Sequence, residues 1–238
     1  MLTPWVGSGF NVSARCRGAG GVAGGDFYTL AVRSPGKIGV VVGDVCGRGP
    51  DGAARLSQIL PEVRSLALSG IAPARLLFEL NRVVAAELPM DCFVTAAAFE
   101  LDAQAKVLTV ANAAHVPGML RTACDGLVSL VGHASGVALG MGANTRYLDE
   151  RYDLNAGDVL VLMTDGVLEA MEPDLLSMSA VKRLLAEAAY GGREAHQLLL
   201  NNLAECCQGR ATDDMTLVTL EVISESRVET ESHLARAS

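Results

Sequence analysis

Apolar residues along the chain gather into short runs that are typical of strands, and turn residues separate the runs. FNVSARC and DFYTLAVR each predict a strand, and a glycine-rich stretch joins the two. KIGVVVGDV and DVLVLMTDG are almost fully apolar, which predicts buried strands. The remaining strand-like segments are FVTAAAFELD, AKVLTVANA, GMLRT, GLVSL and MTLVTLEV. The close succession of the first four, in the middle of the chain, favours antiparallel meanders over βαβ crossovers.

Helical spacing of apolar residues predicts helices in two parts of the chain. One helix extends from Asp51 to about Ser69, and a second begins near Pro73, a residue that suits the first turn of a helix. Two further helical patterns cover about 175–189 and 194–206. One face of each helix must be buried, so the helices are expected to pack against other elements.

Length and composition indicate one packed domain. The chain has 238 residues, of which 50% are hydrophobic and 19% are charged, and this balance is that of a globular core. We expect a single domain over 1–222. The polar residues 223–238 are expected to form a disordered C-terminal tail.

Charge and hydropathy exclude several classes of partner. The net charge is −8, and no basic cluster is present to attract nucleic acid or anionic lipid. No apolar run approaches the roughly 20 residues of a membrane span, and the N-terminus lacks the pattern of a signal peptide. A cytoplasmic protein is expected. The cysteines have no metal-binding or disulfide spacing and are interpreted as free thiols: Cys16, Cys46, Cys92, Cys124, Cys206 and Cys207.

Aspartates recur at the ends of the predicted strands. Asp44 and Asp165 each follow an apolar run, Asp213 and Asp214 precede the last strand, and Asp26 stands at the start of another. Each one alone is often only a turn residue. A carboxylate beside a buried strand is costly unless it is paired or bound to a cation, so their recurrence indicates convergence on metal ions.

Ligands that are all oxygens favour Mg²⁺ or Mn²⁺ over zinc, which prefers cysteine and histidine. Two such ions that share a carboxylate can activate a water and stabilise an in-line phosphoryl displacement. The pattern therefore predicts a metal-dependent phosphohydrolase. At this level kinase-like and nuclease-like sites stay open.

Six motifs in order resemble those of the protein phosphatase 2C (PPM) superfamily, and most closely its bacterial SpoIIE-like branch. They are GGDFY, VVVGDVCGRG, FVTAAAFELD, ANAAHVPGML, VLVLMTDGVLEA and TDDMTLVTLEV, and together they span about residues 10–222. The resemblance implies an α+β fold, an α-β-β-α sandwich of two antiparallel sheets flanked by helices. It also implies a centre of two Mn²⁺ or Mg²⁺ ions that hydrolyses phosphoserine or phosphothreonine on a protein.

The resemblance assigns roles to matching positions. Asp44 is similar to the acid that bridges both ions, and Val45 would lend its backbone carbonyl. Asp26 matches a ligand of one ion, and Asp165 and Asp213 match the pair on the other. A water between the ions would attack directly, so no protein nucleophile is implied.

Four positions need separate treatment. Asp214 takes the second place of the DD pair, where relatives also carry Asn, so it ranks below Asp213 as a ligand. Cys46 and Arg48 stand where relatives usually have Ser and His. Arg48 is a candidate phosphate contact through its fork of donors, and its alternative is a solvated loop arginine. His115 is interpreted as a structural turn histidine.

The implied substrate is a phosphorylated regulatory protein, such as an anti-sigma-factor antagonist. About ten residues precede the first predicted strand, so regulation is expected from a separate partner, from a homodimer, or from movement of the two helices after Asp44. One alternative is a catalytically weak or inactive phosphatase fold that binds a phosphoprotein. A cyclic-dinucleotide synthase is disfavoured, because its GG(D/E)(D/E)F signature needs a second acid where Phe27 follows Asp26.

Overall fold

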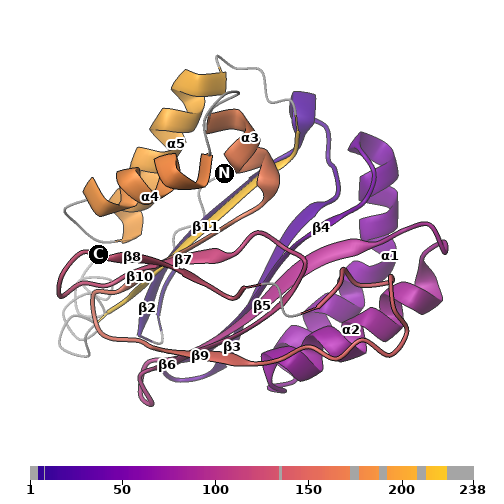
Figure 1. Cartoon of the computed structure of the whole chain (residues 1–238), viewed down its shortest axis with the longest axis horizontal. Coiled ribbons are helices and arrows are strands. Elements are labelled where there is room, and N and C mark those ends of the chain that lie inside the picture. Colours follow the sequence, from indigo (N-terminus) through magenta and orange to yellow (C-terminus); the bar gives the residue numbers. More distant parts are fainter. Residues whose placement is uncertain are drawn as a thin grey trace, which may run out of the picture.

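The computed structural model of the chain describes residues 5–7, 9–133, 136–171, 177–187, 192–207 and 213–223. Two antiparallel sheets lie face to face, and helices cover their outer faces (Figure 1). This confirms the predicted α-β-β-α sandwich. The predicted tail lies outside the described residues, apart from Ile223. None of the described helices is both long and apolar enough to cross a membrane.

The first sheet has five strands in the order β3-β4-β5-β6-β9. The neighbours β3 to β6 form an antiparallel meander. The predicted meander from FVTAAAFELD to GLVSL is divided between the sheets, because FVTAAAFELD and AKVLTVANA pair in this sheet whereas GMLRT and GLVSL pair in the other. The fifth strand, β9, was not predicted, because its four residues ERYD have no apolar run. The bounds are β3 Asp26–Ser34, β4 Lys37–Val45, β5 Val94–Asp102, β6 Val107–Ala113 and β9 Glu150–Asp153.

The second sheet has six strands in the order β1-β2-β11-β10-β7-β8. Their bounds are β1 Trp5–Gly7, β2 Phe10–Arg17, β7 Gly118–Arg121, β8 Val128–Val131, β10 Val159–Met163 and β11 Met215–Val222. Strand β1 was not predicted. The two strands on either side of the glycine-rich stretch, β2 and β3, belong to different sheets. The stretch therefore crosses the sandwich, and it includes a short 3-10 turn at Ala19–Gly21.

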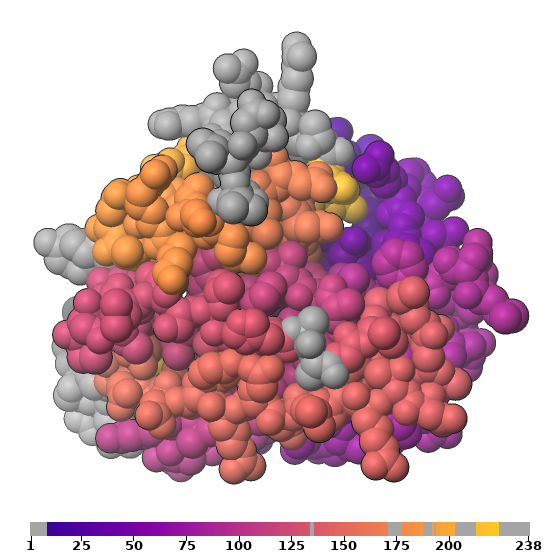
Figure 2. Space-filling view, viewed as in Figure 1, coloured from indigo at the N-terminus to yellow at the C-terminus, as the bar shows by residue number. Residues whose placement is uncertain are grey.

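Two groups of helices cover the sandwich (Figure 1). Helices α1 (Gly49–Leu68) and α2 (Pro73–Glu87) confirm the two predicted helices, and both pack on the first sheet. Helices α3 (Asp165–Met171), α4 (Ser177–Glu187) and α5 (Gly192–Cys207) pack on the second. Figure 2 shows α4 and α5 in orange on the outside of this layer. The seven-residue α3 was not predicted.

The central core lies between the two sheets. Val42 and Phe99 of the first sheet meet Leu160 and Val218 of the second, and all four are almost completely buried. These central strands are covered on both faces, one by the other sheet and one by helices. That double coverage explains why their sequences are continuous apolar runs rather than alternating ones.

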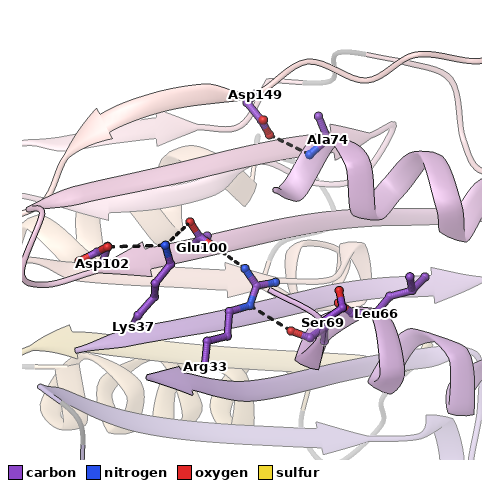
Figure 3. Close-up of polar contacts among 9 residues, drawn as sticks. Arg33, Lys37, Leu66, Ser69, Ala74, Glu100, Asp102 and Asp149 are labelled. Carbon is purple, nitrogen blue, oxygen red and sulfur yellow. Dashed lines mark hydrogen bonds and ion pairs between the residues drawn. The ribbon is translucent and has the colours of Figure 1, made fainter. Parts of the chain in front are cut away.

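A charged cluster closes the first sheet at the end opposite Asp44 (Figure 3). Glu100 of β5 forms ion pairs with Arg33 of β3 and with Lys37 at the start of β4. Arg33 Nε also donates to the Ala67 carbonyl at 3.1 Å, which fastens the end of α1 to the sheet. With one end tied in this way, α1 begins at the other end, beside the aspartates.

Candidate active site

The aspartates predicted at strand ends gather at one end of the sandwich. Asp26 and Asp44 are directly opposite each other on β3 and β4. Asp165 comes just after β10 and Asp213 just before β11, and these strands are antiparallel neighbours whose pairing reaches Met163 and Leu217. Each sheet therefore contributes one pair of carboxylates to the same end.

Asp26 is held by a residue that sequence reasoning missed. Asp26 is 7% exposed, and its Oδ2 accepts a hydrogen bond of 2.6 Å from the Thr164 hydroxyl. The same hydroxyl accepts the Thr216 N–H at 2.9 Å, so Thr164 links Asp26 of the first sheet to two strands of the second. The sequence signal that could have identified Thr164 is its hydroxyl directly after the apolar run of β10.

The pKa values of both carboxyls on the first sheet are raised. Burial raises the pKa of Asp26 to about 7. Hydrogen bonds from threonines lower this pKa, and repulsion from Asp214 and Asp165 raises it further. Burial raises the pKa of Asp44 to about 8, with further repulsion from Asp26, Asp165 and Asp213. A cation placed among these groups would favour their charged forms.

The backbone of the glycine-rich stretch leaves room for a carbonyl ligand. A Cβ atom on Gly25 would lie 2.2 Å from the Val45 carbonyl oxygen and 2.7 Å from Asp44 Oδ1. These two oxygens therefore face the same space beside Gly25. The Val45 N–H donates to the Gly25 carbonyl at 3.1 Å, which holds the two segments together.

The carboxylates on the second sheet are more open. Asp165 is exposed and is the first residue of α3, rather than merely the residue that follows a strand. Asp213 has a side chain that is 27% exposed, and its Oδ1 accepts the N–H of Asp214 at 2.8 Å. Both side chains are accessible from solvent, as ligands of an exchangeable ion need to be.

Asp214 lies differently from its neighbour. It is 5% exposed, and its two oxygens accept backbone N–H groups of the glycine-rich stretch, from Ala19 at 2.8 Å and from Gly25 at 2.9 Å. Its lower rank as a metal ligand stays a prediction, but its carboxylate has a clear structural contact.

The residues that depart from the related motif lie at the edge of the site. The Arg48 side chain is 86% exposed, and its Nη2 lies 4.0 Å from Asp213 Oδ2. Cys46 is tied into the turn, because its carbonyl accepts from Arg55 Nη1 at 2.7 Å and its Sγ accepts from the Phe93 N–H at 3.3 Å. Arg55, on α1, was not singled out in the sequence.

His115 is buried and contacts Thr95, with 2.9 Å between Nδ1 and Oγ1. Burial lowers the pKa of His115 to about 4, so the ring is neutral at ordinary pH. Its N–H and carbonyl both bond the Asn112 side chain, which is the arrangement of a turn histidine.

The donor set fits hard divalent cations in kind. It consists of carboxylates and one backbone carbonyl, the ligands that Mg²⁺ and Mn²⁺ prefer. In the part of the chain that the structure describes, no three histidine, cysteine or acidic side chains lie close enough together to form a ready-made metal cluster. The ligands would therefore have to move closer together around a cation. A cavity of about 550 Å³ lies between the glycine-rich stretch and α1 and borders Asp26. It leaves space into which that stretch can shift.

The raised pKa values predict how stability depends on pH when a chelator is present. Folded Asp26 and Asp44 keep protons up to about pH 7 and about pH 8 respectively, whereas an unfolded aspartate loses its proton near pH ~3.9. The folded state then binds more protons, so the free energy of unfolding should fall as pH rises from about 6.5 to about 8 and should level off above that, where both states have lost these protons. His115 and His196, with pKa values lowered to about 4, are neutral there and add little slope.

Thermal melts followed by circular dichroism across this range would measure the effect. The variant Asp44→Asn should show a flatter dependence, because it lacks one of the two carboxyls. A melting temperature that stays level or rises with pH in the wild-type protein would contradict the prediction.

Comparison with known proteins places the chain in a family. The family model described as Stage II sporulation protein E (SpoIIE) matches residues 34–223, which is most of the chain. The chain belongs to the SpoIIE family. It is 29% identical over 198 residues to the phosphoserine phosphatase RsbU of Bacillus subtilis (strain 168), covering 82% of this chain and 58% of that protein. The SpoIIE-family chain thus spans little more than half the length of that relative.

Solved structures show the same fold. The RsbU and RsbW domains of Rv1364c from Mycobacterium tuberculosis superpose with a TM-score of 0.79 at 26% identity, over 93% of this chain and 62% of that one. The PP2C phosphatase domain of SpoIIE from Bacillus subtilis, solved with a fragment of its regulatory domain, gives a TM-score of 0.77 at 18% identity, over 94% and 64%. The sandwich is therefore of the PP2C phosphatase type, as the motifs predict.

Proposed function

We propose that this protein is a metal-dependent serine/threonine phosphatase that acts on a phosphorylated protein. The observation that carries the proposal is the convergence of Asp26, Asp44, Asp165 and Asp213 at one end of a PP2C-type sandwich, with the Val45 carbonyl facing the space beside Asp44. These oxygens would hold two Mn²⁺ or Mg²⁺ ions. When bound, such a pair activates a water and stabilises an in-line phosphoryl displacement.

The protein's own residues would prepare the site. Asp44 lies beside Asp26 and is also repelled by Asp165 and Asp213, which supports a role in which it would serve both halves of the site. Thr164 would keep the Asp26 carboxylate in a defined orientation. Arg48 is exposed near Asp213, where its planar donors can bind a phosphate group in two places at once.

The proposed substrate is a phosphoserine or phosphothreonine on a regulatory protein, such as an anti-sigma-factor antagonist. Support comes from the relative RsbU, which is named a phosphoserine phosphatase, and from the structure that joins RsbU and RsbW domains in one chain. We also propose that the protein is cytoplasmic and that a separate partner or a second copy controls its activity.

A second candidate function is a phosphatase fold that binds a phosphoprotein without turnover. The replacement of the usual Ser and His by Cys46 and Arg48 favours it. Two observations weigh against it. The Cys46 carbonyl and Sγ accept hydrogen bonds that hold the turn, and the proposed side-chain ligands are all present.

The test is release of phosphate from a phosphoserine peptide in the presence of Mn²⁺. We expect turnover that is abolished by a chelator and restored by adding Mn²⁺ or Mg²⁺. Wild-type protein that binds the phosphopeptide but releases no phosphate with either ion would establish the binding function and reject the phosphatase.

A further inference from the structure

The carboxylate of Asp214 joins two segments that are almost two hundred residues apart in the sequence. Oδ1 accepts the Ala19 N–H at 2.8 Å and Oδ2 accepts the Gly25 N–H at 2.9 Å. These two amides lie at the two ends of the stretch that crosses from β2 to β3. One side chain therefore fixes both ends of this crossing segment.

The glycines of this segment are fitted to the carboxylate. A Cβ atom on Gly24 would lie 1.5 Å from Asp214 Oδ2, so any other residue at position 24 would displace the side chain. On the other side of Asp214, a Cβ on Gly166 would lie 1.9 Å from the Asp214 carbonyl oxygen. Asp214 is thus packed between the glycine-rich stretch and the start of α3, with little freedom to move.

This packing sets the position of the groups around Asp44. Gly25, whose N–H bonds Asp214, comes directly before Asp26, and its carbonyl accepts the Val45 N–H. A shift of Gly25 would therefore move the Asp26 carboxylate and the Val45 carbonyl together. Asp214 controls this position from the opposite sheet, because it directly precedes β11.

We propose that Asp214 is a positioning residue rather than a metal ligand. Its carboxylate clamps the glycine-rich stretch across the two sheets and so places Asp26 and the Val45 carbonyl. The consequence for catalysis rests on the proposed function. The clamp itself does not, because it is made of hydrogen bonds that need neither metal nor substrate.

Amide hydrogen exchange in chelator tests the clamp without any activity measurement. In Asp214→Ala, the Ala19 and Gly25 amides should exchange at least about tenfold faster than in the wild type, since each loses a charged acceptor. The matched control is Asp213→Asn on the neighbouring carboxylate, which should leave both amides protected. Unchanged protection in Asp214→Ala would overturn the proposal.

The conservative variant Asp214→Asn distinguishes a positioning role of Asp214 from a role as a metal ligand. It also provides a test if Asp214→Ala does not fold. Asparagine keeps one carbonyl acceptor, so one of the two amides should stay protected and the other should not. Its affinity for Mn²⁺, measured by titration of free Mn²⁺ in electron paramagnetic resonance, should fall by about 10–100-fold, the loss typical of a residue that orients ligands. Asp213→Asn should lose more.

A third variant acts from the opposite side of the contact. Ala19→Pro removes one donor without altering either aspartate, and Gly18 already has the extended backbone that precedes proline (ψ 150). It should weaken Mn²⁺ binding in the same direction as Asp214→Asn. If Asp214→Asn instead abolished Mn²⁺ binding as fully as Asp213→Asn while both amides stayed protected, Asp214 would be a ligand. An inactive wild-type protein with a protected stretch would reject the phosphatase and keep the clamp.

Discussion

Replacing Asp44 with asparagine is expected to lower kcat/KM for a phosphoserine peptide by on the order of 10³-fold, which corresponds to the several kcal/mol that metal ions supply to a displacement of this kind. The reason is its central place, since Asp26, Asp165 and Asp213 all act on its carboxyl. The amide would keep the size of the side chain but lose the negative charge that a shared ligand needs. Steady-state phosphate release at saturating Mn²⁺ measures the effect.

The matched control for this change is Asp153→Asn. Asp153 is exposed at the end of β9, and it pairs with Val107 at the far end of the first sheet from the aspartate cluster. The control should keep the wild-type rate. An Asp44→Asn variant that is folded and nearly as active as the control would reject the central role of Asp44.

Replacing Gly25 with alanine should have the second-largest effect. The added methyl group would lie 2.2 Å from the Val45 carbonyl oxygen and 2.7 Å from Asp44 Oδ1, so both groups must move. A displacement of catalytic groups by about 1 Å costs roughly 10²-fold in rate, and overpacking costs about 1–3 kcal/mol of stability. Phosphate release and thermal melts of the same preparation measure the two losses separately.

Gly20→Ala provides the control within the same stretch. A Cβ at this position meets no atom within 4 Å, although the backbone is left-handed with φ +61. The control should therefore lose about 1–2 kcal/mol of stability through strain but keep its activity. If the two variants lost activity equally, the effect would come from stiffening the stretch rather than from contact with Val45 and Asp44.

Much of the fold was predictable from local patterns. Burial can be read directly from the apolar runs of β4, β10 and β11 and from the helical spacing in α1 and α2. The period of each element determines which of its residues lie on the buried face. The elements that were missed, β1, β9 and α3, are short. They exist because a longer neighbour supplies the pairing or packing, as β6 does for β9.

Local patterns also predicted the positions at which the carboxylates lie. An aspartate at the end of a predicted strand predicts an acid at the end of the sheet where that strand begins or ends. This holds for Asp44 at the end of β4 and for the DD pair before β11. The chemistry expected of them, the binding of hard cations by oxygen, followed from the residue types alone.

The sequence by itself therefore determined which elements form and which acids stand at their ends, because both depend on neighbours a few residues away. Only the tertiary structure decided that β2 and β3 lie in different sheets and that the glycine-rich stretch crosses between them. It also separated two adjacent aspartates, Asp213 at the open site and Asp214 on the backbone of that stretch. The direction of each side chain depends on contacts with residues far away in the sequence, which no local pattern records.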